Sequence, residues 1–194
     1  VLVTTCVAAA GGGVVAAIAS TIKYKNLDLT MFLNGVLGGL VGITAGADVM
    51  SPTSAIIIGA ISGLLIVFAV SCIDRLKLDD PVGAIAVHLV CGIWGTLAVG
   101  IFGFSAVTND AGDFLNANGD VVATISEAAN ALSFLPQLYG VLAYAVICII
   151  SSFLIIFILK KTIGIRVSER EELEGLDAHE HGMEAYPDFR LNEH

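Results

Sequence analysis

Charged residues are scarce in this sequence. Only 14% of its 194 residues are charged and 56% are hydrophobic, whereas about a quarter of the residues in a typical soluble domain are charged. The mean hydropathy is +0.88, which indicates an integral membrane protein. The net charge of −9 argues against nucleic acid as a partner, because a phosphate backbone requires a basic protein face.

The chain also lacks the motifs of common enzyme sites. It has no P-loop, no GxSxG and no HExxH sequence. Its four cysteines lie in apolar runs without a CxxC pair or a metal-ligand spacing. We therefore predict that the protein is not an enzyme and holds no cofactor and no metal. No basic region precedes the apolar residues at the N-terminus, so we expect no cleavable signal peptide and a chain that begins within a longer protein.

Long apolar runs dominate the sequence instead. Five of them are long enough to cross a bilayer, which takes about 20 residues of α-helix. The predicted spans are residues 1–22, 29–47, 53–73, 81–103 and 136–159. They define a transmembrane region over 1–163 and a tail over 164–194, with a long polar loop at 104–135. The predicted fold class is an all-α integral membrane protein.

Basic residues are missing from every second connection between these spans. All nine lie at Lys23 and Lys25, at Arg75 and Lys77, or from Lys160 onward. Cytoplasmic segments carry the excess of Lys and Arg in membrane proteins. We therefore predict a multi-pass protein of the cell (plasma or inner) membrane, with the N-terminal end of this chain outside and the C-terminus in the cytoplasm.

His88 is the only histidine within a predicted span, and an ionisable group inside the bilayer is by default a candidate functional residue. Three interpretations stay open: a structural residue bonded to a neighbouring helix, a pore residue that handles or excludes protons, or a haem ligand. A haem would need a second membrane histidine, which this sequence does not contain and which a helix outside this chain would have to supply. A neutral imidazole donates from one nitrogen and accepts at the other, which suits the passage of a proton or a small polar molecule.

Other polar residues lie within the spans or at their ends. Asp79 and Asp80 precede the fourth span, as a helix cap or as vestibule charges that attract cations. Thr44, near the outer end of the second span, offers its hydroxyl to a ligand or to its own helix. Asn34 is the one amide in that span, and Trp94 is expected to be a packing residue of the fourth.

The tail is acidic and has no apolar periodicity long enough for a core. It is either a solvated extension or a docking segment for a cytoplasmic partner. One or two helical turns are expected over 168–173, ended by Gly175. His179 and His181 are weak candidates for metal ligands, because two histidines in a flexible tail are not a metal-binding pattern by themselves.

Three stretches together resemble the ammonium transporter (Amt/Mep/Rh) family. They are LNGVLGGLVGITAG from Leu33 to Gly46, DDPVGAIAVHLVCGIWGTLAVGIF from Asp79 to Phe102, and GIRVSEREELEGLDAHEHGMEAYPDF from Gly164 to Phe189. Their order and spacing match over nearly all of the chain. The resemblance implies an eleven-helix inverted-repeat transporter fold, of which this chain holds the last five transmembrane helices, and a homotrimer with one pore in each subunit.

The resemblance also implies roles for individual residues. His88 matches the second of a pair of pore histidines, and Ala84, one turn before it, lines the inner pore. Thr44 matches a hydroxyl residue of the outer ammonium recruitment site, and Asp80 matches an aspartate at the cytoplasmic start of the histidine helix. A regulatory tail that contacts neighbouring subunits and a PII-type signalling protein is implied for Gly175, Leu176, Asp177, His181, Gly182 and Tyr186.

The function implied by the resemblance is transport of ammonium or ammonia across a lipid membrane through a hydrophobic pore lined by His88. A second hypothesis is an ammonium sensor of the same fold, which couples occupancy to signalling. The tail, with no catalytic domain after it, favours transport over a fused sensor. A third hypothesis is a cofactor-holding membrane subunit with His88 as the ligand.

Overall fold

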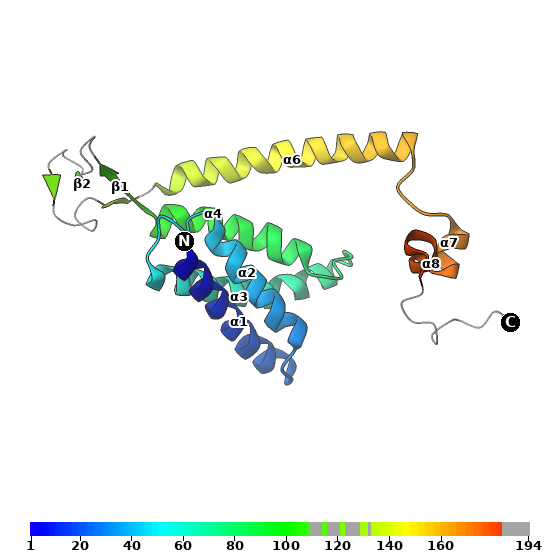
Figure 1. Cartoon of the computed structure of the whole chain (residues 1–194), viewed down its shortest axis with the longest axis horizontal. Helices are drawn as coiled ribbons and strands as arrows, with labels where there is room; N and C mark the ends of the chain where they lie inside the picture. Colours follow the sequence, from blue (N-terminus) through cyan, green and yellow to red (C-terminus); the bar gives the residue numbers. More distant parts are fainter. Residues whose placement is uncertain (109–113, 116–120, 123–128, 132, 184–194) are drawn as a thin grey trace. The chain divides into compact units, whose positions relative to one another are not determined.

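The structure is a computed structural model, and it describes residues 1–108, 114–115, 121–122, 129–131 and 133–183 (Figure 1). The chain forms two compact units, Val1–Tyr144 and Ala145–His194. The first unit contains a bundle of helices and a small sheet. The second contains the later part of a long helix, followed by two short helices.

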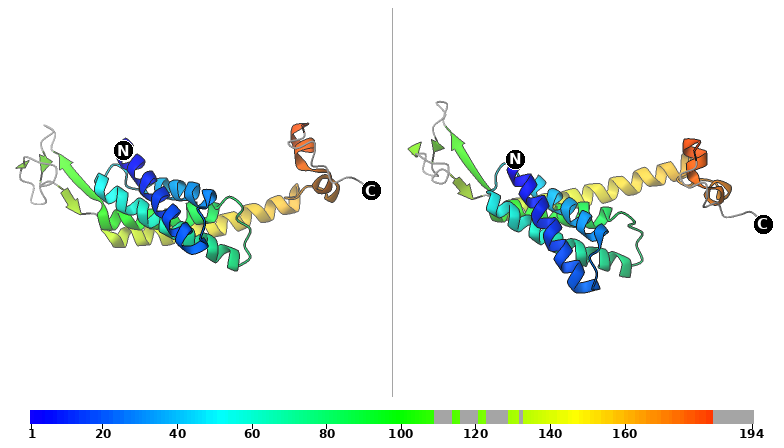
Figure 2. Two further views of the ribbon diagram at one scale, coloured as in Figure 1. Left: turned by 90° about the horizontal axis from the view of Figure 1, so that it is seen from below. Right: turned by 60° about the horizontal axis from the view of Figure 1, so that its bottom comes forward.

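Three helices pack along one another in the first unit (Figure 2). They are α1 (Leu2–Tyr24), α2 (Leu29–Thr44) and α3 (Pro52–Arg75). A Cβ on Gly12 would overlap the carbonyl oxygen of Gly35, and a Cβ on Gly59 would overlap that of Ala8. Such backbone-to-backbone contact is how helices associate in a membrane, where burying apolar side chains gives no driving force between helices.

The fourth helix begins later than the sequence predicts. A turn at 81–83 precedes η1 (Ile85–Val90), a stretch of π-helix, and α4 (Cys91–Phe102) continues from it. Gly83 has a φ of 73°, a left-handed conformation that glycine adopts without strain and that interrupts a right-handed helix. The helix therefore starts after Gly83 rather than at residue 81.

The described residues of the segment expected to be a polar loop at 104–135 form four short strands. They are β1 (Phe104–Thr108), β2 (Phe114–Leu115), β3 (Val121–Val122) and β4 (Ala129–Ala131). They pair antiparallel in the order β3-β2-β1-β4, with Phe104 opposite Ala131 and Thr108 opposite Phe114. The N–H of Phe104 donates to the carbonyl of Val49 at 2.9 Å, which ties the sheet to the turn after α2.

α6 (Phe134–Thr162) is the longest helix, and it belongs to both units. Its first turn contacts α4 closely, because a Cβ on Gly100 would lie 2.5 Å from the Cα of Phe134. Within the described part of the chain no residue of α6 is buried. Its apolar side chains are therefore available to lipid or to another protein surface.

The helix lengths agree with an all-α membrane protein. Among the residues that the structure describes, four helical segments are long and apolar enough to cross a membrane: α1, α3, η1 with α4, and α6. At 16 residues, α2 is shorter than the span predicted over 29–47 and is about 24 Å long. It ends at Thr44 because the chain turns there, with the N–H of Gly46 bonded to the carbonyl of Ile43 at 3.0 Å.

Candidate functional site

An acidic side chain caps the histidine helix. Both carboxylate oxygens of Asp80 accept hydrogen bonds from the N–H of Ile85, at 3.2 and 3.1 Å, and Oδ2 also accepts one from Ala86 at 3.3 Å. The first N–H groups of a helix have no carbonyl partner within it. Asp80 therefore satisfies two of them and places negative charge at the positive end of the helix dipole. Asp79 is exposed beside it.

The turn before the histidine helix packs against α2. Asn34 of α2 is 6% exposed, and a Cβ on Gly83 would lie 2.7 Å from its amide nitrogen. The positive φ of Gly83 and this close approach both require a residue without a side chain. α2 thus holds the turn from which the Asp80 cap acts.

His88 lies in the π-turn, and its side chain is exposed. Ala84 and Leu89 are exposed as well, whereas Ala86 and Val87 are buried in the bundle, where η1 meets α2 and α3. The histidine helix therefore has one face in the bundle and one face that the described residues leave open. The imidazole is on the open face.

Beyond His88 the helix is fixed to its neighbours. The indole N–H of Trp94 donates to the carbonyl of Ile58 on α3 at 3.2 Å. A Cβ on Gly95 would lie 2.5 Å from the carbonyl oxygen of Gly42 on α2. Trp94 is thus more than the packing residue expected, because its polar atom has a defined partner within the membrane.

Thr44 is exposed at the end of α2, where its hydroxyl donates to the carbonyl of Leu40 at 2.6 Å. This is the bond to its own helix that is common for threonine. The oxygen still has lone pairs for an N–H donor. Thr44 and Asn34 are ten residues apart, or about 15 Å along α2, so Thr44 does not lie with the Asp80 turn.

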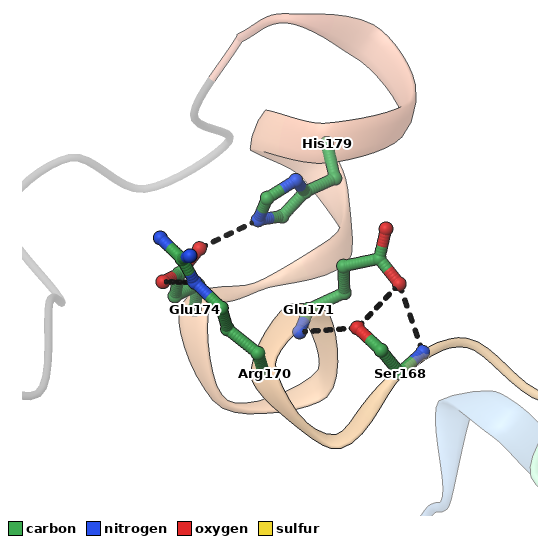
Figure 3. A network of polar contacts seen from close by, with 5 residues as sticks. All are labelled: Ser168, Arg170, Glu171, Glu174 and His179. Carbon is green, nitrogen blue, oxygen red and sulfur yellow. Dashed lines mark hydrogen bonds and ion pairs between the residues drawn. The ribbon is translucent and has the colours of Figure 1, made fainter.

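The tail begins with a capping box. In α7 (Glu169–Glu174), Ser168 Oγ accepts from the N–H of Glu171 at 3.3 Å, and the Glu171 carboxylate accepts from the N–H of Ser168 at 2.8 Å (Figure 3). The Ser168 hydroxyl also donates to the Glu171 carboxylate at 2.7 Å. This bond, followed by the one from the Ser168 N–H, lowers the pKa of the Glu171 carboxyl, because both favour its charged form. The helical turns expected over 168–173 are thus present and capped at their start.

Glu174 joins α7 to α8 (Leu176–His181). Its carboxylate accepts from Arg170 Nε at 2.6 Å and lies 2.8 Å from His179 Nε2 (Figure 3). The hydrogen bonds with Arg170 and His179 lower the pKa of the Glu174 carboxyl. The spacing of Arg170 and Glu174 is an i,i+4 helical pair, so the sequence contains a signal for this bond, but none for the contact with His179.

The predicted tail residues lie in or beside α8. Gly175 and Gly182 have positive φ values of 98° and 65° and flank that helix. Within α8, Leu176 and His181 are exposed and Asp177 is partly buried, while Tyr186 lies outside the described residues. No group of three or more His, Cys, Asp or Glu that could hold a metal ion occurs in the described part of the chain.

The sequence is similar to known proteins over nearly its whole length. The model of the Ammonium Transporter Family matches residues 1–186. Ammonium transporter Amt2 of Archaeoglobus fulgidus is 37% identical over 189 residues, which cover 97% of this chain and 39% of that protein. Ammonium transporter Amt2 of Methanocaldococcus jannaschii is 37% identical over 193 residues, with the same coverage of 97% and 39%.

Solved structures with the same fold include proteins described as Amt and Mep2. A sensor Amt protein superposes with a TM-score of 0.72 at 34% identity, over 92% of this chain and 41% of that chain. Candida albicans Mep2 has the same fold, with a TM-score of 0.68 at 23% identity, over 98% of this chain and 42% of that one.

The chain spans about two fifths of the length of the curated relatives described above. The matches confirm the predicted fold class and the resemblance on which the functional expectations rest. They also confirm a family of membrane transporters rather than of enzymes. The chain belongs to the ammonium transporter family.

Proposed function

We propose that the full-length protein conducts ammonium across a membrane and that His88 lines the path. The observation that carries this proposal is the position of His88, exposed with Ala84 on the open face of its helix, in a chain of the ammonium transporter family. A histidine with a purely structural role would be expected in the bundle, with Ala86 and Val87. Polar groups inside a membrane face protein or a water-filled cavity rather than lipid, so further protein is expected to cover this face.

The chemistry of ammonium fits such a path. Moving a bare cation into hydrocarbon is very costly, whereas neutral ammonia is far cheaper to transfer. Ammonium captured at the outer mouth would lose its hydration shell and release a proton, so that ammonia and the proton cross separately. The His88 imidazole, with one donating and one accepting nitrogen, is a polar station for either. Potassium has no proton to give and would be rejected.

The remainder of the path is proposed from the positions of other side chains. Thr44 would recruit ammonium at the outer mouth, where its oxygen can accept an N–H donor, and Ala84 would line the inner pore next to His88. The rest of the pore wall, including the first histidine of the pair, would come from protein beyond this chain. We propose a homotrimer with one pore in each subunit.

The ends of the helices support the proposed orientation. Lys23 lies at the end of α1, where its ammonium donates to the carbonyl of Val67 at 3.1 Å, and Lys160 and Lys161 end α6. Basic residues gather on the cytoplasmic side, so the tail would be cytoplasmic and the sheet outside. The exposed α7 and α8 would then be available to neighbouring subunits or to a PII-type partner.

Ammonium-evoked current in liposomes carrying the full-length protein tests the transport role. His88→Ala is expected to change the current strongly, and His194→Ala, a substitution at a histidine with no proposed role, serves as the matched control. If the His88 and His194 variants both conduct like the unaltered protein, His88 is not part of the path. Absence of any current from the folded unaltered protein would exclude transport itself.

A second candidate function is ammonium sensing. It is favoured by the similarity to a structure described as a sensor Amt protein, at 34% identity and a TM-score of 0.72. A sensor would bind ammonium at the outer site without a sustained current. Calorimetric binding of ammonium to the full-length protein, together with an absent current in the same liposomes, would therefore favour sensing over transport.

A further inference from the structure

The histidine helix is held at two points with a π-turn between them. Before the turn, the Asp80 carboxylate holds the N–H groups of Ile85 and Ala86. After it, the indole of Trp94 is bonded to the carbonyl of Ile58 on α3. Ile85–Val90 between them is π-helical. A π-turn closes i→i+5 rather than i→i+4 hydrogen bonds, so it holds one residue more than an α-turn, and such turns are frequent at functional sites.

We propose that this π-turn is the element that positions His88, an inference that rests on the proposed function. Each residue of an α-helix turns the chain by about 100°. Without the extra residue, everything before the turn would therefore be rotated by about 100° relative to α4. Val87, directly before His88, is buried at 2% exposure, and Leu89, directly after it, is 57% exposed. A change of one residue in register therefore decides which side chain occupies the place of the imidazole.

The two fixed points explain why the turn persists. The Asp80 cap and the packing of Gly83 on Asn34 set the rotation of the first part of the helix. The Trp94 bond sets the rotation of α4. The extra residue reconciles the two, with Ala86 and Val87 in the bundle and His88 out of it. A rotation of 100° would displace the ring by far more than the roughly 1 Å that can cost a site about two orders of magnitude.

A pair of single-residue deletions in the full-length protein tests this role. Both remove the extra residue of the turn. Deleting Leu89 rotates His88 by about 100° relative to α4, and deleting Val87 rotates it by the same angle relative to the Asp80 cap. Because the π-turn is what keeps His88 in register with both fixed points, we expect each deletion to lower the ammonium-over-potassium selectivity by about tenfold or more.

A double-mutant cycle separates positioning from general damage to the fold. If the π-turn acts through the imidazole, deletion of Leu89 in a His88→Ala background should cause no further loss of selectivity. Equal losses with and without His88, or a deletion of either residue that behaves like the unaltered protein, would each overturn the positioning role. His88→Ala with unchanged selectivity would instead overturn the proposed function itself.

Trp94→Phe is the length-preserving alternative if the deletions do not insert into the membrane. It keeps the aromatic ring and removes only the indole N–H that holds α4 on Ile58. A several-fold loss of selectivity is expected with His88 present and none in the His88→Ala background. The same loss in both backgrounds, or no loss in either, would contradict the role of the π-turn.

Discussion

The Asp80 carboxylate lies 3.1 Å from the backbone nitrogen of Ile85 and accepts its hydrogen bond. This contact spans five residues, because the turn at 81–83 separates the aspartate from the helix that it caps. The Asp80 side chain therefore both caps the helix and holds the first residues of the π-turn. Asp80 thus has a structural role, whether or not its charge also attracts cations.

Asp80→Ala is expected to destabilise the full-length protein by about 1 kcal/mol, the typical cost of losing a helix cap. Asp80→Asn, which keeps an acceptor oxygen, should lose much less. Thermal unfolding in detergent measures both, with Asp79→Ala as the control for a neighbouring charge. An Ala variant as stable as the Asn variant would show that the hydrogen bonds to Ile85 and Ala86 contribute nothing.

Gly83→Ala is expected to cost about 1–2 kcal/mol from the left-handed backbone alone. The added Cβ would also lie 2.7 Å from the amide nitrogen of Asn34, and this close approach adds to the cost. Gly140→Ala is the matched control, because a Cβ there meets nothing within 4 Å and the residue is helical. The same unfolding measurement applies, and equal stability of the two variants would contradict the strained turn.

The apolar runs predicted the transmembrane helices well, because burial in lipid requires a continuous apolar segment whatever the helix packs against. Asp80-Pro81 has the pattern of a cap followed by a helix, so the sequence predicts a helix start at residue 81. The helix begins later because Gly83 has a positive φ, and the sequence does not reveal the sign of a glycine's φ. The strands in 104–135 are two to five residues long, too short for a recognisable alternation.

For the candidate site, the sequence singles out His88 because it is an ionisable residue within a predicted span. Its role in a pore stays a prediction. The indole bond of Trp94 and the contact of Glu174 with His179 depend on tertiary neighbours, which periodicity cannot supply. The π-turn has no sequence signature of its own, because it results from the two fixed ends of the helix.

The link between α7 and α8 is expected to weaken in acid. The pKa of the Glu174 carboxyl is lowered from 4.5 by its hydrogen bonds with Arg170 and His179. The stabilisation that the charged carboxylate gives to the link is therefore fully present above pH 4.5 and is lost as pH falls through the lower pKa of the folded tail. NMR signals of the tail amides in the full-length protein would follow this loss. Glu174→Gln should weaken the link already at neutral pH, with Glu180→Gln as the control. Tail signals that are insensitive to both acid and Glu174→Gln would refute the contact.

Deletion of residues 166–194 is expected to alter ammonium flux without preventing membrane insertion. The ion pairs of Arg166, Arg170 and His179 with Glu172 and Glu174 all lie within residues 166–194, so deletion removes both partners of each pair. Stopped-flow flux in liposomes, normalised to the amount of inserted protein, measures the effect. Unchanged flux would argue against a regulatory tail.

The most direct test of the central claim is the reversal potential of the full-length protein in mixed ammonium and potassium gradients, measured with and without His88→Ala. The reversal potential of the unaltered protein should follow the ammonium gradient. The variant should lose ammonium-over-potassium selectivity by about tenfold or more, which lowers the free-energy discrimination between the two ions by at least about 1.4 kcal/mol. Equal selectivity in the two proteins would contradict a pore role for His88.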